Sequence, residues 1–228
     1  MTEAMSFLTG WTTTNRANPQ TIIVSPDGSV VYTFTAGALS GVWNSSANFS
    51  TSEGSMITCS CGVMGLGRTE GAGTGYIGNS SGLGLYPDYH PYPYWKSTAT
   101  ITSNGGQVGG VGAVAVDWSI DVNNNPVVVY GCTGVMGPIA VLMGEIDATA
   151  NVVLFNVSGV SGIPSGATAA NTSVSIAFDG HTLSLPAAVF ESDGNDMSGA
   201  DSVISRSFGF KGLSSKTGGS GVGPFKMS

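Results

Sequence analysis

Two cysteines separated by one residue are the pair of side chains in this sequence whose spacing best suits metal binding. Cys59 and Cys61 would lie on one face of a β-strand, because side chains alternate along a strand. With Cys132 and a histidine they could form a four-ligand zinc site. A lone C-x-C pair is a weak metal motif, however, and Cys132 lies in an apolar segment where a buried thiol acts as a small apolar side chain. We therefore expect no metal site and no cofactor.

The sequence contains little material for general acid–base catalysis. Its two histidines each follow an aspartate by two positions, as Asp88 with His90 and Asp179 with His181. Asp179-Gly180 is better explained as a hairpin turn, because Asp-Gly supplies the positive φ angles that such turns need. We predict no catalytic residues and no enzymatic activity. A polysaccharide hydrolase remains as an alternative, with an acidic pair that the sequence does not assign.

One acidic cluster combines oxygen ligands with a glycine-containing loop, a combination that suits calcium. Its members are Glu191, Asp193, Asp196 and Asp201. Their spacing does not match an EF-hand loop, which ends in a bidentate glutamate at its twelfth position. A solvated acidic loop is therefore the preferred interpretation.

The most distinctive local feature is a segment in which tyrosines alternate with prolines. Prolines hold a chain extended, and tyrosine and tryptophan present flat amphipathic rings. Such a surface suits burial in a subunit interface or stacking on sugar rings, while the rings could equally complete the protein's own core. The candidate interface or glycan-binding residues are Tyr86, Tyr89, Tyr92, Tyr94 and Trp95.

The charge distribution excludes one class of partner. Between Lys96 and Arg206 there is no lysine or arginine but there are nine acidic residues, and the net charge is −7. Nucleic-acid binding needs basic side chains that displace counterions from phosphates, so no nucleic-acid partner is expected. No run approaches the ~18 apolar residues of a membrane span, and the first residues lack the pattern of a signal peptide.

Short alternating segments separated by turn residues predict an all-β protein. Three predicted strand pairs are 21–24 with 29–35, 111–122 with 127–132 across Asn123-Asn124-Asn125-Pro126, and 173–178 with 181–185. A fourth is 145–147 with 151–157. Recurrent hairpins of this kind favour a β-sandwich or jelly-roll-like core of about eight to ten strands.

We divide the chain into a single domain and two arms. The sandwich-like domain is expected over 19–210, with a long glycine- and aromatic-rich insertion at 62–95. Residues 1–18 are expected to form an N-terminal arm and residues 211–228 a flexible C-terminal arm.

In overall character the chain resembles virion proteins of tailed bacteriophages, being rich in Gly, Ser, Thr and Asn and poor in lysine. The resemblance implies a non-enzymatic virion protein, such as a capsid decoration, tail or fibre component. Its expected partners are copies of itself, with a trimer as the simplest homo-oligomer, and other virion proteins. The alternative is a carbohydrate-binding module or adhesin that binds surface glycan through the tyrosine-rich segment, and no membrane partner is expected.

Overall fold

The computed structural model confirms an all-β, sandwich-like fold. It describes residues 22–24, 30–34, 42–65, 67, 69–72, 92–103, 106–108, 114–131, 138–155, 172–196, 205–214 and 223–228. The expected N-terminal arm over 1–18 and Cys132 lie outside these residues. No helix in the described ranges has the length and hydropathy needed to cross a membrane.

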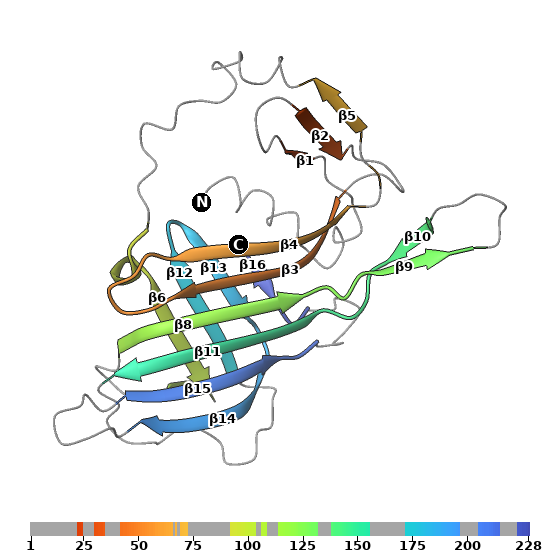
Figure 1. Cartoon of the computed structure of the whole chain (residues 1–228). Helices are drawn as coiled ribbons and strands as arrows, with labels where there is room; N and C mark the ends of the chain where they lie inside the picture. Colours follow the sequence, from red (N-terminus) through yellow and green to blue (C-terminus); the bar gives the residue numbers. More distant parts are fainter. Residues whose placement is uncertain are drawn as a thin grey trace.

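The first layer of the sandwich is a six-stranded antiparallel sheet. Its strands, in spatial order, are β14 (Ala188–Asp196), β15 (Ser205–Gly212), β11 (Asp147–Phe155), β8 (Val114–Asn123), β3 (Val42–Thr51) and β4 (Thr58–Gly65). In Figure 1 these strands run side by side across the molecule, with β4 and β14 at the two edges.

The second layer is a five-stranded antiparallel sheet that lies against one face of the first. Its strands, in spatial order, are β16 (Lys226–Met227), β13 (His181–Leu185), β12 (Thr172–Phe178), β6 (Thr98–Ser103) and β7 (Gly106–Gln107). Figure 1 shows them behind the first sheet and steeply inclined to it, as in orthogonally packed sandwiches. The two layers together contain more strands than the expected eight to ten.

The core forms because apolar and polar residues alternate along the strands of both layers. In β11 every second residue from Ala148 to Leu154 is buried, and β12 alternates in the same way. Trp118 of the first sheet stacks on Phe178 of the second, with ring centroids 5.8 Å apart. The largest fully buried side chains are Phe49, Phe208, Ile101, Ile120, Ile176, Leu183, Leu185, Val152 and Val174.

The Asp179-Gly180 turn matches its prediction. Residues 173–178 and 181–185 pair within β12 and β13, and Asp179 and Gly180 have φ angles of 49° and 74°. The pairing of 21–24 with 29–35 is also confirmed, as β1 (Ile22–Val24) with β2 (Val30–Phe34). β2 also pairs with β5 (Thr69–Ala72) in a separate three-stranded sheet.

The predicted hairpin at residues 123–126 is wrong. The chain does not reverse there but continues from β8 into β9 (Val127–Tyr130), which pairs with β10 (Pro138–Leu142). Asn125 adopts a φ of 46°, and its amide donates to the Asn123 side chain at 3.0 Å. The buried Asn124 amide donates to the Ser45 carbonyl at 2.8 Å. The first bond is local and the second reaches β3, and with both in place the strand continues without turning back.

The predicted strand pair between 145–147 and 151–157 is also wrong. β11 is one continuous strand, because β8 and β15 hydrogen-bond to its two edges and leave no break between Asp147 and Phe155. Val157 lies outside the described residues.

The structure describes two parts of the expected flexible C-terminal arm, 211–214 and 223–228, and both contain residues that belong to sheet strands. Lys211 and Gly212 complete β15, and β16 pairs with β13 near the last residue. Phe225 is only 7% exposed, so the end of the chain contributes to the core. A Cβ at Gly212 would lie 2.4 Å from the Pro224 carbonyl oxygen, so the absence of a side chain permits this close approach.

The first part of the expected insertion at 62–95 belongs to strands. Residues 62–65 belong to β4, and Thr69–Ala72 form β5. Residues 73–91, which include Tyr86 and Tyr89, lie outside the described residues.

The alternation of faces can be tested on neighbouring residues of β8. Replacing Ile120, which is fully buried, by Ala should lower the free energy of unfolding by about 2–5 kcal/mol because it leaves a cavity. Replacing Ser119, on the outer face, by Ala should change it by less than about 0.5 kcal/mol. Urea denaturation measures both, and equal losses would contradict the assignment of the two faces.

Candidate functional site

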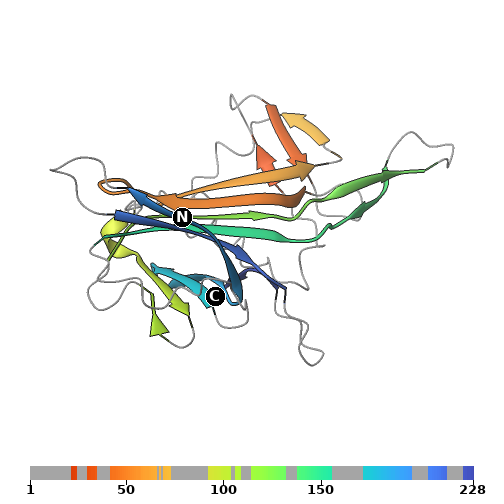
Figure 2. The same cartoon turned by 90° about the horizontal axis from the view of Figure 1, so that it is seen from below.

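The two-stranded sheet formed by β9 and β10, here called the ribbon, projects beyond the sandwich (Figures 1 and 2). Its strands are direct continuations of β8 and β11, the two central strands of the six-stranded sheet. Within the described part of the chain, neither ribbon strand has another strand on its outer edge. Both edges therefore present backbone hydrogen-bonding groups to a further strand.

The ribbon carries a concentration of exposed apolar side chains. Val127 and Leu142 face one another across it and are 55% and 57% exposed. Tyr130 is 70% exposed and Ile139 is 45% exposed. No Asp, Glu, Lys or Arg occurs from Val122 to Gly144. Exposed apolar side chains gathered on one water-exposed element suit contact with another protein.

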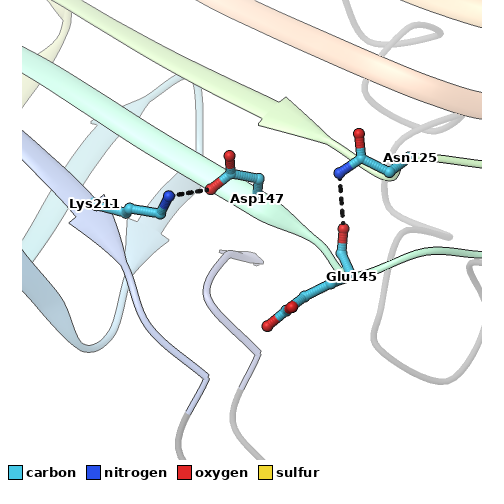
Figure 3. A network of polar contacts seen from close by, with 4 residues as sticks. All are labelled: Asn125, Glu145, Asp147 and Lys211. Carbon is cyan, nitrogen blue, oxygen red and sulfur yellow. Dashed lines mark hydrogen bonds and ion pairs between the residues drawn. The ribbon is translucent and has the colours of Figure 1, made fainter.

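Polar contacts hold the base of the ribbon to the sandwich (Figure 3). The Asn125 amide group donates to the Glu145 carbonyl at 3.0 Å, and the Gly144 amide donates to the Asn125 carbonyl at 3.1 Å. Lys211 of β15 lies 3.2 Å from the Asp147 carboxylate at the start of β11. Because both members of that ion pair are exposed, it contributes at most about 1 kcal/mol. The hydrogen bonds between the two chain segments therefore set the direction of the ribbon.

The outer face of the six-stranded sheet is polar but weakly charged. Its three central carboxylates have partners: Asp121 accepts from Asn48, Asp117 from the amide of Glu53, and Asp147 pairs with Lys211. A hollow of about 390 Å³ on this sheet is lined by Ser46, Ala47, Asn48, Ser60, Cys61, Gly62, Asp121, Val122, Asn123, Asp147 and Thr149. The three carboxylates thus join neighbouring segments of this face to one another.

The tyrosine-rich segment is described from Tyr92 onward, and its rings have different environments. Tyr92 packs against the core, its carbonyl accepts from the Ile57 amide at 2.7 Å, and its hydroxyl donates to Asp179. This hydrogen bond raises the pKa of Tyr92, because it stabilises the protonated phenol. Tyr92 therefore fastens the segment to the β12–β13 turn.

Trp95, in contrast, is 67% exposed. It lies in the 3-10 turn η2 (Tyr94–Lys96), where the half-buried Tyr94 ring meets it edge to face at a centroid distance of 5.5 Å. The Tyr94 amide donates to the Ser55 carbonyl at 3.1 Å, which joins this turn to the β3–β4 loop. That loop has a shallow hollow of about 390 Å³ lined by Ser50, Thr51, Ser52, Ser55, Met56 and Thr58.

Cys59 and Cys61 lie on the same face of β4, at the margin of the core, as their spacing predicts. Their sulfur atoms are 3.6 Å apart. The hydrogen bond between the two thiols lowers the pKa of Cys61 to about 7 and raises the pKa of Cys59, which burial raises further. Sequence spacing indicates the shared face, but only the structure shows that the sulfurs are in contact.

Comparison with known proteins gives no assignment. No protein-family model matches the chain, and no curated protein matches its sequence. Functional inference therefore depends on the ribbon, the exposed tryptophan and the cysteine pair.

Proposed function

We propose that this protein is a non-enzymatic structural component of a viral particle, used in several symmetric copies. A capsid decoration, tail or fibre component of a tailed bacteriophage fits its all-β fold and its Gly-, Ser-, Thr- and Asn-rich composition. The observation that carries the proposal is the projecting ribbon, whose apolar side chains are exposed and whose two edges are open in the described structure.

A ribbon of this kind needs additional contacts to be stable. A two-stranded hairpin alone is marginally stable in water, and a third strand or a packed layer is needed for independent stability. Pairing with another strand or covering by another subunit would provide this layer. It would also remove apolar surface from water, at about 25 cal/mol for each Å².

The electrostatics favour another copy of the same chain as the partner. The whole chain has a net charge of −7, so two copies repel each other where acidic surfaces meet. The ribbon contains no charged side chain and so provides a surface on which identical subunits can meet without like-charge contacts. Symmetric self-association through one self-complementary patch is the commonest form of homo-oligomer.

The proposal can be tested by placing charges on the ribbon. The double variant Val127→Lys, Leu142→Lys should dissociate the oligomer, because both side chains are exposed and face one another. Light scattering coupled to size exclusion gives the mass of the wild type and the variant. The matched control is Val114→Lys, at a similarly exposed position (57%) at the far end of β8.

A defined oligomer for the wild type and for Val114→Lys, with a monomer for the double variant, is the expected result. A wild type that is monomeric at every concentration, and that does not bind to phage capsids or tails, would remove the basis of the proposal.

A second candidate function, binding of surface glycan, is favoured by one observation. Trp95 exposes a flat ring next to a loop rich in Ser and Thr hydroxyls, a combination suited to stacking on a sugar and hydrogen bonding to it. Tyr92 is less suited to this role, because its ring packs against the core.

Glycan binding can be separated from a general effect of exposed aromatic rings. If the second function holds, Trp95→Ala should weaken binding on a glycan array by about tenfold, which corresponds to about 1.4 kcal/mol. Tyr130→Ala is the control, because Tyr130 is similarly exposed (70%) but lies on the ribbon. Equal binding by wild type and Trp95→Ala would exclude Trp95 as the sugar platform.

A further inference from the structure

The cysteine pair of β4 has the geometry of a chelating dithiol. Cys59 and Cys61 are two residues apart on a regular strand that pairs residue by residue with β3 at this point. Their sulfur atoms are 3.6 Å apart and point to the same side of the sheet. Two soft ligands are thus held together by the strand itself.

The sulfur–sulfur distance matches the separation required by a tetrahedral thiolate metal site. Zinc–sulfur bonds are about 2.3 Å long, so two sulfurs on one tetrahedral zinc ion lie about 3.8 Å apart. The observed sulfur–sulfur distance of 3.6 Å is close to this value, so a small side-chain movement would bring the two into agreement. The two sulfur atoms therefore need little rearrangement to bind one metal ion.

A disulfide is a poorer fit to the same two residues. Its sulfurs must approach to about 2.0 Å. Residues two apart on a strand have Cα atoms about 6.6–6.8 Å apart, at the upper end of the range of about 4.4–6.8 Å found in disulfides. Oxidation would therefore distort β4, whereas metal binding would leave the strand in place.

The surroundings suit a neutral metal–dithiolate unit. The residues paired with Cys59 and Cys61 on β3 are Phe49 and Ala47, which carry no charge. Two thiolates balance the charge of a divalent ion, so the half-buried site would carry no net charge. Both thiols are partly exposed and β4 is an edge strand, so an ion can reach the pair.

We propose that Cys59 and Cys61 form a bidentate site for a thiophilic d¹⁰ divalent cation, with Zn²⁺ as its representative. Within the described residues, no cluster of three or more His, Cys, Asp or Glu side chains is arranged to hold a metal. The proposed site takes two ligands from the protein, and water or small exogenous ligands fill its two remaining tetrahedral positions. A metal held this way is an open site, unlike the closed four-ligand site of a structural zinc.

The test uses the full chain, reduced and freed of metal, and Cd²⁺ as a spectroscopic probe. Titration should produce the ultraviolet thiolate-to-cadmium charge-transfer band, saturating at one ion per chain with an intensity of two thiolates per ion. Zn²⁺ should abolish the band by competition. Cys59→Ser and Cys61→Ser should each weaken binding by at least about tenfold, the lower end of the effect of removing even an outer-shell partner.

The matched control is Cys132→Ser, which retains both proposed ligands and should bind Cd²⁺ like the wild type. Full-strength binding by either Cys59→Ser or Cys61→Ser would overturn the proposal, and so would loss of binding in Cys132→Ser. Circular dichroism confirms that each variant is folded. If a serine variant is not, the corresponding alanine variant replaces it, because a methyl group suits the apolar margin of the core.

Discussion

The structure depends on the antiparallel pairing of β8 with β11 at the centre of the six-stranded sheet. This ladder runs from Asp147 opposite Asn123 to Phe155 opposite Val114. It sets Ile120 beside Ala150 on the inner face, where the second sheet covers them. The same two strands continue into the ribbon, so the packing of the core and the position of the exposed apolar surface are linked. A change in register would move both, because a shift of one residue exchanges the two faces of a strand.

Local sequence patterns predicted the fold class and some of its hairpins. Alternating apolar residues indicated the strands, and Asp179-Gly180 indicated its turn, because both signals depend on neighbouring residues. The run from Asn123 to Pro126 has equally strong turn residues, yet the strand continues. Its path is decided by partners distant in sequence, the Ser45 carbonyl and Glu145. The buried position of Phe225 at the chain end depends in the same way on distant contacts.

The candidate sites were predictable to different degrees. Spacing alone placed Cys59 and Cys61 on one face, but the distance between their sulfurs is a property of the folded strand. Composition drew attention to the tyrosine-rich segment but could not separate its members. Tyr92 is held by Asp179, whereas Trp95 remains exposed, and this difference comes from the tertiary structure. The ribbon was missed because the segment of β9 was assigned to a hairpin with β8 and that of β10 to no strand, although the uncharged stretch from Val122 to Gly144 was a usable signal.

The central claim is that the ribbon is the surface through which copies of this chain associate. Amide hydrogen exchange, followed by mass spectrometry at low and high protein concentration, tests it most directly. The account predicts that amides of Val127–Tyr130 and Ile139–Leu142 become more protected as concentration rises, while those of β12 and β13 do not change. Protection that rises with concentration elsewhere but leaves the ribbon unchanged would contradict it.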